Sequence, residues 1–151
     1  MPLGALEMTC EAKLLYGDPP MMTSERDPSL NVGRRFISAL ARQSWDDLAG
    51  CLDPKVQFRA VTPKGFRTAD DRAAAAGYLR KWFGDADQLA LQSSDVELMH
   101  DRLRVAYRIR EHEDQWYIVE QQAYCTVHDG QIMVMDLLCS GFRPEVPEGP
   151  S

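Results

Sequence analysis

The stretch that decides the fold is Tyr117–Phe142, YIVEQQAYCTVHDGQIMVMDLLCSGF. Apolar and polar residues alternate along much of its length with the period of two that is typical of a half-buried β-strand. The polar triplet His128-Asp129-Gly130 divides the stretch and suits a tight turn. The sequence therefore predicts two long antiparallel strands, residues 116–127 and 132–139.

Which side chains of this hairpin face inward depends on the turn. A three-residue turn, residues 128–130, pairs Ala123 with Met135 and buries the more apolar row. A two-residue turn at Asp129-Gly130 shifts the register by one residue and turns the opposite row inward. We favour the first register because it buries the apolar row. That row is Gln121, Ala123, Cys125, Met133, Met135, Leu137 and Cys139; the alternative brings Glu120, Gln122 and Tyr124 inward.

Upstream of the hairpin, apolar residues recur at helical spacing in three segments that follow residues suited to capping a helix. Asp27 or Ser29 caps the first helix, in DPSLNVGRRFISALARQ. Ser44 caps the second, in SWDDLAGCL. The third is rich in alanine, follows Thr68 and ends at Gly84.

Alternation typical of strands marks residues 55–61, between the second and third helices, and residues 88–99 and 103–110 after the third. An α+β fold is therefore predicted, with three N-terminal helices packed on a curved, mostly antiparallel sheet. Such a sheet forms a cone with an internal cavity. We expect one domain over residues 29–143, a flexible extension at 1–28 and a flexible tail at 144–151.

Composition narrows the classes of function. The 151 residues carry a net charge of -6, and a nucleic-acid footprint needs an excess of Lys and Arg on one face. No apolar run approaches the ~20 residues that span a bilayer, and no secretory signal is recognisable. The four cysteines are widely spaced, without the pairing of a zinc site. We expect a cytoplasmic protein with reduced thiols that binds neither nucleic acid, membrane nor metal.

The order of elements over residues 29–143 resembles the nuclear transport factor 2-like (cystatin-like) superfamily, and especially its SnoaL-like branch, which includes polyketide cyclases. The resemblance rests on FISALARQSWDDLAGCLDPKVQF, residues 36–58, and on VHDGQIMVMDLLCSGF, residues 127–142. The superfamily includes ketosteroid isomerase, limonene epoxide hydrolase, scytalone dehydratase and proteins without catalysis. The resemblance therefore implies a fold with a cavity and leaves the reaction open.

The resemblance also implies where catalytic groups would stand. Phe36 takes the place of the isomerase's oxyanion-hole tyrosine and Phe58 the place of its base, while its second acid falls near Ala123. The acid on the last strand of the epoxide hydrolase aligns with about Leu137. Phenylalanine neither accepts a proton nor donates a hydrogen bond, so the sequence disfavours the mechanisms of the isomerase and the epoxide hydrolase.

Two polar residues remain as candidates for catalysis inside the cone. Tyr107 shares an apolar row with Val105 and Ile109, and its hydroxyl, beside Gln121, could hold a carbonyl or enol. Both residues also fit a plain core. The predicted lining of the cavity, which could equally be core, is Phe36, Phe58, Tyr78, Trp82, Ala123, Cys125, Met135, Leu137 and Cys139.

The leading hypothesis is a SnoaL-like protein that binds a small lipophilic molecule, polyketide-like or terpenoid-like, and cyclises or isomerises it without a cofactor. One alternative is a module that binds a ligand or partner without catalysis. Another is a dehydratase or hydratase that uses Glu120 and Tyr124. Ile132, Val134 and Leu138 would be costly to leave in water on the outer face of the sheet, which predicts a homodimer through that face.

Overall fold

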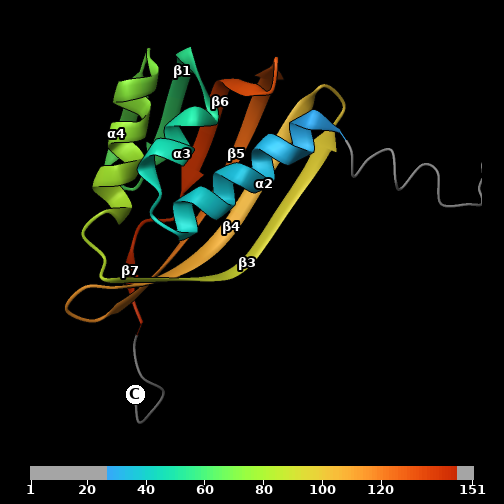
Figure 1. Cartoon of the computed structure of the whole chain (residues 1–151). Helices are drawn as coiled ribbons and strands as arrows, with labels where there is room; N and C mark the ends of the chain where they lie inside the picture. The colour runs from blue at the N-terminus through green and yellow to red at the C-terminus, as the bar shows by residue number, and fades with distance from the viewer. Residues whose placement is uncertain (1–26, 146–151) are drawn as a thin grey trace, which may run out of the picture.

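The structure is a computed structural model, and it describes residues 27–145. Residues 1–26 of the predicted extension and residues 146–151 of the predicted tail lie outside the described residues. The described part contains one mostly antiparallel sheet with three helices on one of its faces (Figure 1). None of these helices combines the length and the apolar character needed to cross a membrane.

The first two helices begin after the residues that the capping patterns indicate, and the third begins later than predicted. Helix α2 (Pro28–Ala41) has Asp27 as its N-cap, whose carboxylate accepts a hydrogen bond from the Ser29 amide at 2.8 Å. Helix α3 (Trp45–Gly50) follows Ser44. Helix α4 (Arg72–Phe83) is capped by Asp71, which accepts from the Ala74 amide at 2.8 Å, rather than by Thr68.

The strands run in the order β2-β1-β6-β5-β4-β3, with the short β7 beside β5. Only β1 and β6 pair in parallel among the described strands; the other pairs are antiparallel. The sequence did not predict β2 and β7. The strands are β1 (Leu52–Thr62), β2 (Gly65–Ala69), β3 (Gln88–Met99), β4 (Arg102–His112), β5 (Trp116–His128), β6 (Gln131–Cys139) and β7 (Arg143–Pro144).

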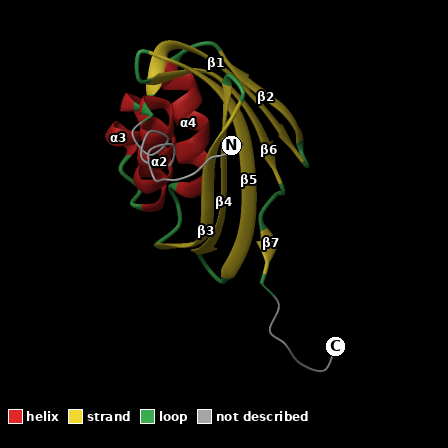
Figure 2. Cartoon of the chain, turned by 90° about the vertical axis from the view of Figure 1, so that its right-hand side faces the viewer, coloured by secondary structure: helices red, strands yellow, loops and turns green. Residues whose placement is uncertain are grey.

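The sheet curves around the helices and stays open at its edges, which leaves one face covered and the other bare (Figure 2). The core lies between the helices and the inner face. Phe36 of α2 and Phe58 of β1 are 0% and 1% exposed within it. The predicted class, helices packed on a curved and mostly antiparallel sheet, is confirmed.

The turn of the decisive hairpin differs from the favoured prediction. Asp129 (φ 53°) and Gly130 (φ 74°) form a two-residue turn of the primed type, which pairs His128 with Gln131. A β-bulge in the hairpin then places one extra residue on β6, so Ala123 pairs with Leu137 and not with Met135. The one-residue shift made by the turn and the one-residue shift made by the bulge add up to two residues, and a shift of two leaves the same side chains on the inner face. The apolar row is therefore buried as predicted, although its turn was predicted wrongly.

The bulge changes the orientation of two residues. Met133, predicted to face inward, is 38% exposed, whereas Ile132, predicted on the outer face, is fully buried. Ile132 is therefore not part of the outer apolar surface on which the homodimer prediction was based. Leu138 remains there at 52% exposure, and the homodimer stays a prediction.

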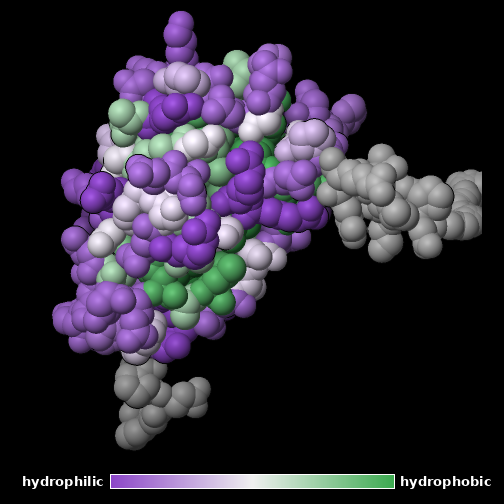
Figure 3. All heavy atoms as spheres, viewed as in Figure 1, coloured by the Kyte–Doolittle hydropathy of each residue, from purple (hydrophilic) through white to green (hydrophobic). Residues whose placement is uncertain are grey.

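Charged side chains cover much of the outer face. Asp136 forms ion pairs with Arg59 at 2.9 Å and with Arg102 at 3.2 Å, and Arg104 pairs with Asp95 and Glu97. Ion pairs across neighbouring strands satisfy these groups on an exposed surface. On the side that carries the helices, apolar surface gathers in one region below α2, near the bent part of β3 (Figure 3).

Candidate functional site

The centre of the cone is filled with side chains. Six of the predicted lining residues lie together on its inner surface and pack against one another, each at most 2% exposed. As they are packed, they form core, and a role in ligand binding at these positions stays a prediction. They are Phe36, Phe58, Ala123, Cys125, Met135 and Leu137. Burial also raises the pKa of the Cys125 thiol to about 12, which keeps it neutral and unreactive.

An aromatic row leads from this core to the surface. The ring of Phe58 stacks on that of Tyr78 with centroids 6.0 Å apart and an interplanar angle of 14°. Trp82, one helical turn further along α4, lies 6.1 Å from Tyr78. Tyr78 and Trp82 are only partly buried and form an aromatic wall, and their role in ligand binding stays a prediction.

That wall borders a pocket of about 640 Å³ at one end of the cone, which we call the open-end pocket. A volume of this size suits a small organic molecule. Its residues come from the β1–β2 hairpin, from α4, from the adjoining ends of β4 and β5, and from the segment after β6. They are Thr62, Pro63, Lys64, Arg67, Tyr78, Lys81, Trp82, Glu111, Glu113, Tyr117, Cys139, Ser140, Gly141, Phe142 and Arg143.

The most unusual group in the open-end pocket is Glu111, near the end of β4. It is only 2% exposed, and its Oε1 has no hydrogen-bond partner among the described residues. Burial raises the pKa of Glu111 to about 8, and the carboxyl groups of Glu113 and Asp85 add to the effect. The side chain is therefore mostly protonated at neutral pH and can exchange its proton near that pH.

Sequence reasoning missed Glu111, although a signal was present. Tyr107 and Ile109 were assigned to the inward row of their strand, and Glu111 falls in the same phase two residues later. The structure confirms that alternation, because β4 buries every second residue from Leu103 to Glu111. A carboxylate in an inward row is costly to bury without a partner, which is why such a position is a candidate for function.

The segment after β6 closes one side of the pocket. Gly141 has φ 86°, and a Cβ atom at this position would lie 2.8 Å from Pro63. Phe142 packs edge-on against Phe83 of α4, with ring centroids 5.4 Å apart. The segment continues into β7, and the Glu145 carboxylate accepts three hydrogen bonds from Arg110, at 2.6–3.2 Å. The pocket wall is thus fastened to both the helix and the sheet.

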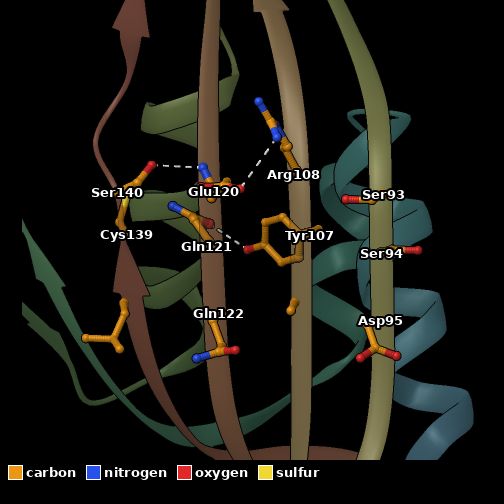
Figure 4. Close-up of a pocket in the computed structure, with 12 residues that line it drawn as sticks. Ser93, Ser94, Asp95, Tyr107, Arg108, Glu120, Gln121, Gln122, Cys139 and Ser140 are labelled. Carbon is orange, nitrogen blue, oxygen red and sulfur yellow. Dashed lines mark hydrogen bonds and ion pairs between the residues drawn. The ribbon is translucent and has the colours of Figure 1, made fainter.

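Tyr107 and Gln121 meet as the sequence predicted. They face each other on β4 and β5, and the Tyr107 hydroxyl donates to Gln121 Oε1 at 2.6 Å (Figure 4). Burial raises the pKa of Tyr107 well above its ordinary value, so the hydroxyl remains a donor. Gln121 Nε2 is buried without a partner among the described residues. The pair does not border the open-end pocket, although Cys139, the partner of Gln121 on β6, does.

The Tyr107–Gln121 hydrogen bond is expected to stabilise the fold. Tyr107→Phe leaves Gln121 Oε1 buried and unpaired, and should lower the free energy of unfolding by about 1–3 kcal/mol. The double variant Tyr107→Phe/Gln121→Leu should recover part of that loss, because it removes both polar groups. Urea denaturation of Tyr107→Phe, Gln121→Leu and the double variant measures the coupling free energy between the two side chains. Strictly additive losses would show that the two groups do not interact.

The alternative dehydratase site is absent from the interior. Glu120 is exposed on the outer face, where its carboxylate lies 3.9 Å from Arg108 and 3.7 Å from Arg143. Tyr124 lies on the same face and pairs with Asp136. A second, shallower pocket of about 490 Å³ borders Arg108, Glu120 and Ser140 (Figure 4). The arrangement proposed for Glu120 and Tyr124 inside the cone is therefore wrong.

Within residues 27–145, no group of three or more His, Cys, Asp or Glu side chains is placed to hold a metal ion. His112 contacts Asp87 at 2.9 Å and Trp116 edge-on, and His128 lies beside Asp129 in the hairpin turn. Both histidines are therefore surface groups whose contacts involve only neighbouring side chains.

Solved structures with the same architecture share little sequence with this chain. An LEH-like epoxide hydrolase from M. tuberculosis is 14% identical, with a TM-score of 0.61 over 77% of this chain and 85% of the other. A proposed polyketide cyclase from Xanthomonas campestris is 20% identical, with a TM-score of 0.61 over 76% and 92%. An NTF2-like protein from Burkholderia xenovorans is 13% identical, with a TM-score of 0.58 over 75% and 89%.

No family model matches the sequence, and the curated proteins contain no significant match. At these identities the likeness concerns the fold alone. The resemblance drawn from the order of helices and strands is confirmed at that level.

Proposed function

We propose that this chain, which has the nuclear transport factor 2-like fold, binds a small cyclic and mostly apolar molecule in the open-end pocket and transfers a proton on it. Glu111 is the group that would carry the proton. The observation behind the proposal is a buried carboxyl, with one unpaired oxygen, in a pocket walled by aromatic rings.

The pKa of Glu111 suits this work. A general acid or base is most effective when its pKa lies near the working pH, and the Glu111 pKa is about 8. The carboxylate form can remove a proton from the carbon next to a carbonyl, and the protonated form can return it elsewhere. Such a shift of a proton is the elementary step of a cofactor-independent isomerisation or of an aldol-type cyclisation.

The walls of the pocket favour a ring system. Tyr78 and Trp82 present aromatic side chains from α4, with Tyr117 and Phe142 from other elements. Flat apolar ligands pack against such side chains with little loss of conformational freedom. A polyketide-like or terpenoid-like ketone fits this description.

Exchange of α-protons tests the proposal without knowledge of the natural substrate. In D₂O at pH 8, the protein should accelerate deuteration of 1-tetralone at the carbon beside its carbonyl, followed by NMR. Glu111→Gln keeps the shape and loses the base, so the enzymatic rate should fall at least tenfold. Glu120→Gln, a carboxylate on the outer face, is the matched control and should keep the rate.

The pH profile gives a second readout of the same step. Because the carboxylate is the active form, the rate of exchange should rise as the pH passes through about 8 and then level off. Binding of the ketone without any accelerated exchange would favour the non-catalytic alternative. Equal loss of exchange in Glu120→Gln and Glu111→Gln would remove Glu111 from its proposed role.

A further inference from the structure

We infer that the molecule bound in the open-end pocket carries a negative charge beside its ring, as a carboxylate or a comparable anion. This inference rests on the proposed function and adds a substrate class to it. It comes from the charges around the pocket, which differ from those of the rest of the protein.

The open-end pocket is rich in cations although the chain is acidic. The protein has a net charge of -6, yet the pocket is bordered by Lys64, Arg67, Lys81 and Arg143. Against these four cations stand two carboxyl groups, Glu111 and Glu113. Glu111 is mostly protonated at neutral pH, because its pKa is about 8. The pocket therefore has an excess of positive charge at neutral pH.

Most of these cations also lack the close carboxylate partners that arginines have on the outer face. On the outer face, Arg59, Arg102 and Arg104 each form an ion pair at or below 3.2 Å. Lys64 and Lys81 form no ion pair with any residue in the described range 27–145.

The two arginines of the pocket are only loosely engaged. Arg67 donates at 2.8 Å to the Phe66 carbonyl, which carries no net charge. Arg143 lies 3.7 Å from Glu120, a long contact between exposed groups. Unmatched cations that converge on one concave surface raise the local concentration of anions and their rate of arrival. The pocket thus retains positive charge that a ligand can neutralise.

The position of the cations also orients the ligand. Tyr78, Lys81 and Trp82 project from one side of α4, at spacings of three and four residues. Lys81 is exposed, whereas Trp82 is partly buried. An anion held at the exposed rim therefore lets the ring extend along the aromatic wall toward Glu111. Charge-assisted hydrogen bonds at the rim would fix that orientation.

Two probes of equal shape and different charge test the inference. Isothermal titration calorimetry of the full chain at pH 7 should show that 2-naphthoate binds about tenfold more tightly than neutral 2-naphthamide. Lys81→Gln should weaken 2-naphthoate about fivefold and change 2-naphthamide less than twofold. Arg80→Gln is the matched control, because Arg80 is the preceding residue of α4, is exposed and does not border the pocket.

The outcomes separate this inference from the proposed function. Equal affinity for the two probes, or an equal loss in Lys81→Gln and Arg80→Gln, overturns the anionic class and leaves ketone exchange at Glu111 untouched. Absence of binding by both probes also overturns it. Failure of ketone exchange with retained preference for 2-naphthoate would instead reject the catalytic proposal and support the anion site.

Discussion

Phe58→Ala is expected to lower the free energy of unfolding by about 3–5 kcal/mol, the range found when a buried phenylalanine is truncated. Phe58 is 1% exposed and packs between the inner face of the sheet and α4. Its ring lies 6.0 Å from that of Tyr78 and 6.3 Å from that of Trp82. Truncation therefore removes buried apolar area and leaves a cavity behind the aromatic wall.

Chemical denaturation followed by circular dichroism measures this loss. Phe66→Ala is the control: Phe66 lies on the neighbouring strand β2 and is 70% exposed, so its truncation should change stability by less than about 0.5 kcal/mol. A loss below about 1 kcal/mol for Phe58→Ala would mean that the centre of the cone is open and not filled. Ligand affinity in the open-end pocket should fall as well, because Tyr78 and Trp82 lose their support.

The helices and the long strands could be predicted because their signals are local. Helical spacing located all three helices; Asp27 caps the first as expected, whereas Asp71 and not Thr68 caps the third. Strand β2 was not predicted, because its sequence GFRTA is short and lies beside a turn. Only its pairing with β1 makes it a strand. Pairing is a long-range property, which five residues cannot reveal alone.

The hairpin register shows a different limit. The buried row Gln121, Ala123 and Cys125 was correct, because the alternation of apolar residues records which face is inside. The turn was wrong, because a three-residue turn and a two-residue turn with a β-bulge give the same alternation. The extra residue is Met133, and its apolar side chain gave no sign that it would face outward.

The sequence predicted one contact inside the cone and missed the buried carboxyl of the open-end pocket, and the catalytic role of Tyr107 and Gln121 stays a prediction. The Tyr107–Gln121 pair was predicted because both residues interrupt apolar rows that face each other. Glu111 was overlooked because it stands at the end of such a row, where it resembles the charged residues of the adjoining turn. A buried carboxyl depends on what covers it, and here the cover comes from elements distant in sequence, α4 and the segment after β6.

Burial of Glu111 predicts a stability that depends on pH. The folded state raises the pKa of this group from 4.5 to about 8 and so binds its proton more tightly than the unfolded chain does. The contribution of Glu111 is therefore most favourable below about pH 4.5 and is lost as the pH rises to 8. At about 1.4 kcal/mol per pKa unit the upper limit is roughly 5 kcal/mol, and access of water from the pocket lowers it toward about 2 kcal/mol.

Comparison with Glu111→Gln isolates this contribution from the titration of the other acids. The amide has nearly the same shape and no charge to bury, so the variant should be more stable than the wild type by about 2–5 kcal/mol at pH 9. Near pH 4.5 the two proteins should differ by less than about 1 kcal/mol. Urea denaturation across this range gives the difference curve. A flat difference between pH 4.5 and 9 would show that Glu111 ionises as an ordinary surface carboxyl, and the acid–base role of the open-end pocket would then lose its basis.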